Sequence, residues 1–130
     1  MIKKIVVDGN DGTGKTTRVE ELSWLFPGVE IVDRGIFSEA TLNEKLFSKN
    51  TIPGSEEEIN FYNKIWRDKD TLYVIVDASP ETCQKRILER GDSIDVEYHN
   101  MEDLIKYRER FLRLFNICKE LTNVMLVNTD

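Results

Sequence analysis

A phosphate-binding loop is the clearest chemical feature of the sequence. Residues 9–16 match the pattern G-x-x-x-x-G-K-[ST] at every fixed position. Glycines let backbone amides surround phosphate oxygens, and the helix that starts in such a loop adds its dipole. The lysine contacts the β and γ phosphates of a nucleoside triphosphate, and the last hydroxyl can bind Mg²⁺. The residues predicted to bind the triphosphate are Gly9, Asn10, Asp11, Gly12, Thr13, Gly14, Lys15, Thr16 and the adjoining Thr17.

The elements around the loop support this interpretation. An apolar run ends just before the loop, and apolar residues at helical spacing follow it from Lys15 to about Phe26. Strand patterns recur along the chain, at roughly 2–7, 29–32, 71–76 and 124–128. They alternate with helical patterns, which predicts parallel strands covered by helices on both faces. We therefore expect one domain over residues 1–130, a three-layer α/β domain of the P-loop NTPase type with a small parallel sheet of about four strands flanked by helices.

Polar caps and apolar faces define the other helices. Ser55, Ser79 and Asn100 each stand at a predicted helix start. A further helix is expected over 38–47, capped by its first residue, and a loop over 48–55. The last helix is expected to turn five apolar residues inward, namely Leu104, Phe111, Phe115, Cys118 and Leu121.

Composition excludes several classes of protein. Acidic side chains (24) outnumber basic ones (18), and the net charge of −6 argues against general coating of nucleic acids. No window holds the about 18 consecutive apolar residues that a membrane helix needs. Cys83 and Cys118 form no metal-binding pair, and the single histidine, His99, lies in a polar segment and is expected at the surface. We expect a cytoplasmic protein that binds small nucleotides, with no nucleic-acid polymer and no membrane as partner; a homodimer stays open.

Three motifs, in the same order, resemble those of thymidylate kinases and related deoxynucleoside and deoxynucleotide kinases. Residues 9–17 (GNDGTGKTT) are similar to the G-x-D-G-x-G-K-T-T signature of that family. Residues 32–34 (VDR), followed by Ser38 and Glu39, are similar to its D-R element at a strand end. Residues 72–90 (LYVIVDASPETCQKRILER) are similar to its strand, S/D-P-E turn and helix with R-x-x-x-R. The resemblance spans most of the chain, in a shortened form.

The resemblance implies a P-loop kinase that moves the γ-phosphoryl group of ATP to a (deoxy)nucleoside monophosphate, with dTMP as the first candidate. Lys15 and Thr16 would hold ATP and Mg²⁺. Asp33 would lie near the metal or the attacking oxygen, and Arg34 would bind phosphate. In the family, the aspartate of the loop, here Asp11, faces the sugar of the acceptor.

The resemblance also implies a mobile lid over residues 91–100. Arg86 and Arg90 would stand where this lid begins and would reach the transferred phosphate. Their spacing of one helical turn is equally typical of a solvated helix face, so both interpretations stay open. Asp77 also ends an apolar strand pattern and competes with Asp33 for the Mg²⁺ role. We favour Asp33 because an arginine adjoins it, whereas Asp77 leads into a turn and a helix cap.

The acceptor site is the least defined part of the sequence. Only a few residues separate Gly28 from Asp33, where members of the family carry a further strand and an acceptor-binding helix. Phe37 is a candidate to contact the acceptor, although aromatic residues such as Phe61 and Trp66 at helical spacing more often belong to a core. Two alternatives therefore stay open. One is a kinase of deoxynucleosides or another small hydroxyl substrate, and the other is a nucleotide-binding module without catalysis.

Overall fold

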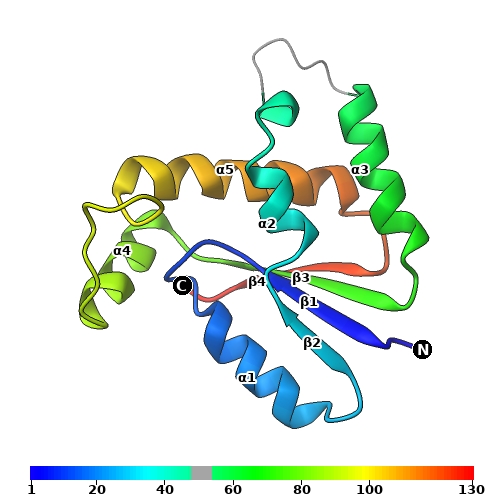
Figure 1. The fold of residues 1–130 in the computed structure, drawn as a ribbon, viewed down its shortest axis with the longest axis horizontal. Coiled ribbons are helices and arrows are strands. Elements are labelled where there is room, and N and C mark those ends of the chain that lie inside the picture. Colours follow the sequence, from blue (N-terminus) through cyan, green and yellow to red (C-terminus); the bar gives the residue numbers. More distant parts are fainter. Residues whose placement is uncertain (48–53) are drawn as a thin grey trace.

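Four strands separated by helices make up the chain (Figure 1). The computed structural model describes residues 1–47 and 54–130, so most of the loop predicted over 48–55 lies outside the described residues. The elements in chain order are β1 (Lys4–Asp8), α1 (Lys15–Leu25), β2 (Glu30–Asp33), α2 (Ile36–Thr41), the short 3-10 helix η1 (Glu44–Phe47), α3 (Glu56–Arg67), β3 (Thr71–Asp77), α4 (Pro80–Glu89), α5 (Met101–Cys118) and β4 (Val124–Asn128).

All four strands run parallel in one sheet, in the order β2-β1-β3-β4, which confirms the predicted fold class. Val7 of β1 lies opposite Asp33 of β2, and Asp8 lies opposite Ile75 of β3, so these strands end at the same edge. The chain passes from β1 to β2 on one side and reaches β3 on the other. The loop after β1 therefore opens at a switch point of the strand order, where parallel α/β sheets bind their ligands.

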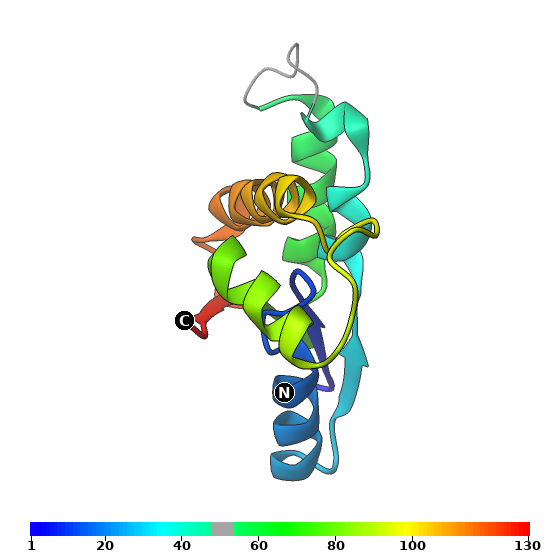
Figure 2. The ribbon, with the colours of Figure 1, turned by 90° about the vertical axis from the view of Figure 1, so that its left-hand side faces the viewer.

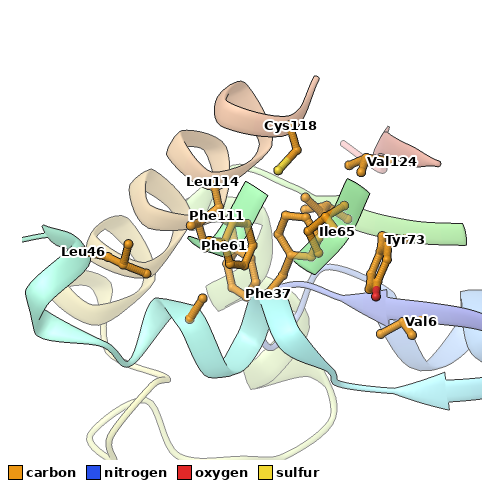
Figure 3. Packing of buried hydrophobic residues seen from close by; sticks show 12 residues of the cluster. Val6, Phe37, Leu46, Phe61, Ile65, Tyr73, Phe111, Leu114, Cys118 and Val124 are labelled. Atoms are coloured by element: carbon orange, nitrogen blue, oxygen red, sulfur yellow. The ribbon is translucent and has the colours of Figure 1, made fainter. Parts of the chain in front are cut away.

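Helices cover both faces of the sheet. α1 lies on one face, and α2, α3 and α5 lie on the other, as Figures 1 and 2 show. Successive residues of β1 alternate between these layers: Ile5 and Val7 join the cluster beside α1, and Val6 joins the opposite cluster. The buried members of this larger cluster (Figure 3) are Val6, Phe37, Ala40, Leu46, Phe61, Ile65, Tyr73, Ile75, Phe111, Leu114, Cys118 and Val124. Burying one large apolar side chain contributes about 1.5–3 kcal/mol, so a cluster of this size holds the helices firmly on the sheet. The edge at which the strands end is thereby held in place.

Most predicted helix ends are confirmed. The side chains of Ser55, Ser79 and Asn100 accept hydrogen bonds from backbone N–H groups in the first turns of α3, α4 and α5. The predicted inner face of α5 is largely confirmed: the half-buried Phe115 packs against the core, and Leu121 also packs there but lies beyond the end of the helix. The residues that α5 buries are Leu104, Tyr107, Phe111, Leu114 and Cys118.

The helix predicted over 38–47 is wrong in its start and its length. α2 begins at Ile36 and is followed by the separate helix η1. Ser38 lies inside α2, and both its N–H and its hydroxyl donate to the Asp8 carboxylate, to which Gly35 N–H also donates. The acceptor that caps this helix therefore comes from the end of β1, far away in the sequence, and no local cap is needed.

The two cysteines are buried and free. Burial raises the pKa of Cys83 to about 11 and that of Cys118 to about 12, so both stay as unreactive thiols near neutral pH. Among the described residues, no helix has the length and apolar character to cross a bilayer.

Candidate functional site

The phosphate loop connects β1 to α1 and takes its shape from three glycines. Gly9, Gly12 and Gly14 all have positive φ, which glycine adopts without the penalty that a side chain imposes. Gly12 also lies against the backbone of α4, since a Cβ built on it would be 2.4 Å from the carbonyl oxygen of Cys83. The loop is thus packed into the fold, and α1 starts at its end with its first N–H groups directed to the loop, as phosphate binding requires.

A pair of glycine substitutions tests this packing. We expect Gly12→Ala to lower the free energy of unfolding by about 3 kcal/mol, because the new methyl group forces the backbone of α4 to move. Gly14→Ala should cost only about 1 kcal/mol, because the nearest atom to its Cβ is 3.8 Å away and only the positive φ is unfavourable. Urea unfolding of both variants measures the difference. Equal losses would contradict the close contact between the loop and α4.

Lys15 and Asp33 meet beside the phosphate loop. The Lys15 Nζ donates to Asp33 Oδ1 at 2.6 Å, with the lysine side chain 6% exposed and the aspartate 45% exposed. The rival acid, Asp77, instead accepts two hydrogen bonds from Arg108, at 3.0 Å from Nε and 3.1 Å from Nη2. Asp77 therefore ties β3 to α5, and the geometry supports Asp33 as the acid at the phosphate loop.

The oxygen donors near Lys15 suit Mg²⁺. Thr16 is exposed and lines a cavity over the loop, so its hydroxyl is accessible. The Asp33 carboxylate is half-exposed and forms an ion pair with Lys15 of the loop. Within the described residues, no three His, Cys, Asp or Glu side chains come together as a metal site. In nucleotide sites, Mg²⁺ is usually held by one or two protein carboxylates together with the phosphates of the substrate.

A cavity of about 230 Å³ lies over the loop. Arg86, in the last turn of α4, and Arg90, at the C-terminal end of this helix, line it. Arg86 is already engaged: its Nη1 donates to the Gly12 carbonyl at 3.2 Å, and its Nη2 donates to the Thr129 carbonyl at 2.7 Å. Arg86 thus ties the phosphate loop to α4 and to the residues after β4. Arg90, which also lines the cavity, forms an ion pair with Asp92. The lining residues are Asn10, Asp11, Gly12, Gly14, Lys15, Thr16, Thr17, Arg86 and Arg90.

A second cavity, of about 380 Å³, opens on the other side of the loop tip. Aromatic side chains form part of its wall, contributed by Tyr98 and by Tyr107 and Phe111 of α5. Arg34 lines it as well, with a φ of +68° that a non-glycine residue rarely adopts and that costs about 1 kcal/mol or more. The lining residues are Gly9, Asn10, Asp11, Arg34, Gly35, Ser38, Glu39, Thr41, Leu42, Tyr98, Tyr107 and Phe111.

The predicted contact between Phe37 and the acceptor is wrong in this structure. Phe37 is fully buried (0% exposed) and packs edge-on against Phe61, with ring centroids 5.0 Å apart (Figure 3). Its helical spacing placed it on the inner face of α2, toward the core. The aromatic wall of the second cavity comes instead from Tyr98, Tyr107 and Phe111, which follow 60 residues or more after it in the chain.

Asp11 lies where the two cavities meet and lines both. Its Oδ1 accepts a hydrogen bond from Arg34 Nη2 at 2.7 Å, and its Oδ2 lies 2.8 Å from His99 Nε2. Burial would raise the pKa of Asp11, but the hydrogen bond with His99 and the charges of Arg34, His99 and Arg90 outweigh it and lower the pKa. The prediction that His99 is only a surface residue is wrong, because its side chain is 15% exposed and contacts the phosphate loop.

A third acid, Asp8, was not predicted. It is the last residue of β1, directly before the loop, and its side chain is 1% exposed. Oδ1 accepts from Gly35 N–H at 2.7 Å, and Oδ2 has no hydrogen-bond partner among the described residues. A buried carboxylate oxygen without a donor is unfavourable. Asp8 ends an apolar strand pattern, as Asp33 and Asp77 do, and this position could have marked it in the sequence as a candidate site residue.

The comparisons with known proteins agree with this geometry. No protein-family model and no curated protein matches the chain. Among solved structures, deoxyadenosine kinase from M. mycoides with bound dCTP is 15% identical with a TM-score of 0.64, over 96% of this chain and 89% of that one. YorR protein from Bacillus subtilis, in complex with phosphorylated GDP, is 20% identical with a TM-score of 0.64, over 98% and 85%. At these identities the likeness establishes the fold alone: this chain shares the parallel α/β fold, with a phosphate-binding loop after the first strand, of these solved structures.

Proposed function

We propose that the protein is a P-loop nucleotide kinase that transfers the γ-phosphoryl group of ATP to a (deoxy)nucleoside monophosphate. The observation that carries this proposal is the pair of cavities that meet at the loop tip, with Asn10 and Asp11 lining both. Phosphoryl transfer needs a donor and an acceptor held in line on the two sides of one phosphate. The binding-only alternative assumed a missing acceptor site, and the 380 Å³ cavity argues against it.

The donor side uses the loop and its cations. Backbone amides of the loop bind the phosphate oxygens, and the Lys15 ammonium moves from Asp33 toward the β and γ phosphates. Arg90, at the rim of the cavity, neutralises charge that develops on the transferred group. When bound, Mg²⁺ neutralises the phosphate oxygens further, and Thr16 and Asp33 would hold it on the protein side.

The acceptor side uses Arg34 and the aromatic wall. We take the 380 Å³ cavity as the acceptor cavity. Arg34 lines it and its side chain is 56% exposed, so the guanidinium can bind an incoming phosphate dianion. A base can pack against Tyr98 and Tyr107, whose rings are 5.3 Å apart. We take dTMP as the first acceptor to test, because the sequence motifs resemble those of thymidylate kinases. The deoxyadenosine kinase with dCTP makes cytosine and adenine nucleotides the next candidates.

Replacing Arg34 by alanine distinguishes a nucleoside monophosphate from a free nucleoside as the acceptor. We expect Arg34→Ala to raise the KM for dTMP about 10- to 100-fold, since a hydrogen bond to a charged group contributes that much. Transfer to thymidine should change little, because thymidine has no phosphate for Arg34 to bind. Steady-state kinetics with both acceptors measures this. The control is Arg18→Ala, which removes an exposed arginine paired with Glu21 on α1, and an equal effect of Arg34→Ala on both acceptors would contradict the phosphate role.

A second candidate function is phosphorylation of a free deoxynucleoside, and Asp8 favours it. The buried Oδ2 of Asp8 can accept a proton from an attacking hydroxyl, and Gly35 and Ser38 beside it line the acceptor cavity. Competition between dTMP, dCMP, dGMP and thymidine for transfer from ATP decides between the candidates. The proposal expects a monophosphate to win. Thymidine outcompeting every monophosphate would favour the second candidate.

A further inference from the structure

We infer that His99 is a positioning residue, which fastens segment 91–100 to the phosphate loop and holds Asp11 in place while Arg34 binds the acceptor. The inference rests on the proposed function and concerns the same site. His99 is the single histidine of the chain, and it reaches Asp11 across a sequence separation of 88 residues. This contact joins the segment directly before α5 to the loop that follows β1, where Asp11 lines both cavities.

Both ring nitrogens of His99 face hydrogen-bond acceptors. Nδ1 lies 3.0 Å from the Ser93 carbonyl oxygen, and Nε2 lies 2.8 Å from Asp11 Oδ2. A carbonyl and a carboxylate can only accept hydrogen bonds, so a ring nitrogen needs a proton to make its contact. The inference rests on the contact of Nε2 with Asp11.

Two side chains share the Asp11 carboxylate in this arrangement. Arg34 binds Oδ1, and His99 binds Oδ2. When a phosphate dianion enters the acceptor cavity, Arg34 is the cation that lines that cavity and can turn toward the phosphate. Without His99, the half-buried Asp11 carboxylate would lose its remaining partner, which is unfavourable. His99 therefore keeps a hydrogen bond to Asp11 when Arg34 turns away from Asp11 to bind the phosphate of the acceptor.

The same contact shapes the acceptor cavity. Tyr98 precedes His99, lines the cavity and has a φ of +70°. Its N–H donates to Asp103 Oδ2 at 3.0 Å, and its ring lies beside Tyr107. Most of segment 91–100 is exposed, so His99 and these contacts of Tyr98 are what attach its end to the site. Loss of the His99 contact should loosen this wall and weaken binding of the acceptor more than binding of ATP.

Asp11 stays an ionised acceptor for this contact. The lowered pKa of Asp11 keeps its carboxylate charged as pH falls toward the acidic range, so His99 and Arg34 keep an ionised partner there.

His99→Ala and His99→Gln together test the inference, because alanine removes the contact with Asp11 whereas glutamine can still donate to it. We expect His99→Ala to raise the KM for the acceptor about tenfold with little change in the KM for ATP, and His99→Gln to recover most of this loss. Asp95→Asn, an exposed acid of the same segment, is the matched control and should keep the wild-type KM values. An unchanged KM for the acceptor in His99→Ala would overturn the inference and leave the kinase proposal intact.

Amide hydrogen exchange gives a readout that needs no turnover. At one pH, segment 91–100 should be less protected in His99→Ala than in the wild type, with His99→Gln close to the wild type. Equal protection of this segment in the wild type and His99→Ala would also overturn the inference. If the wild type phosphorylates no nucleotide, the proposed function fails, while this measurement still decides whether His99 fastens the segment.

Discussion

Replacing Lys15 by alanine is expected to reduce kcat about a thousandfold, which is the upper end for loss of one group that stabilises a transition state. Lys15 is the cation closest to the phosphate loop, and its side chain is almost fully buried between the loop and Asp33. Arg86 cannot take its position, because it is bound to the loop and to Thr129. The loop backbone stays in place in the variant, so some binding of ATP should persist. Steady-state turnover and a titration with an ATP analogue measure the two effects separately.

Lys85→Ala is the matched control for Lys15→Ala. Lys85 lies on the exposed side of α4, 4.0 Å from Glu89, and is 77% exposed. Loss of such an exposed pair changes stability by less than about 1 kcal/mol. We expect Lys85→Ala to have the turnover of the wild type. Full turnover in Lys15→Ala would contradict the assignment of the phosphate loop.

Replacing each of the two strand-end aspartates by asparagine is expected to affect a different property, turnover for Asp33 and stability for Asp77. Asp33→Asn should lower kcat about a hundredfold with little change in Tm, because its half-exposed carboxylate serves Lys15 and Mg²⁺. Asp77→Asn should instead lower the free energy of unfolding by about 2 kcal/mol, because it breaks a bidentate pair with Arg108. Turnover of the folded Asp77→Asn protein should stay close to that of the wild type.

The measurements for these two variants are kcat at saturating Mg²⁺ and the midpoint of thermal unfolding. Loss of turnover in Asp77→Asn, together with full turnover in Asp33→Asn, would reverse the roles given to the two acids. Arg108→Lys offers a further check on Asp77. It keeps the charge but loses the second hydrogen bond, so it should lower Tm and spare kcat.

Features set by local chemistry could be predicted from the sequence. The glycine spacing of residues 9–16 fixes the loop, because only glycine tolerates its positive φ values and its close contact with α4. Strand and helix patterns predicted the parallel sheet, because alternating elements can bury their apolar faces only in layers. The place of Asp33 beside the loop was expected from the resemblance of residues 32–34 to a kinase motif, while its hydrogen bond with Lys15 appears only in the structure.

Features that depend on contacts between distant residues could not be predicted. His99 lies in a polar segment without periodicity, and nothing near it in sequence indicates its contact with Asp11. Ser38 has the residue type of a helix cap, yet the buried Asp8 carboxylate supplies the cap from another strand. In both cases tertiary packing outweighed a local preference. Phe37 differs, because the helical spacing already favoured the core and its use as an acceptor contact went against that pattern.

Product analysis with γ-labelled ATP, Mg²⁺ and each of dTMP, dCMP, dGMP and thymidine tests the central claim most directly. The label should appear in a nucleoside diphosphate, with one ADP formed for each labelled acceptor, and Lys15→Ala should abolish the labelled product. Parallel calorimetry with an ATP analogue establishes that the donor binds. Firm binding of ATP without transfer of the label to any of the four acceptors would contradict a kinase and favour a protein that only binds nucleotides.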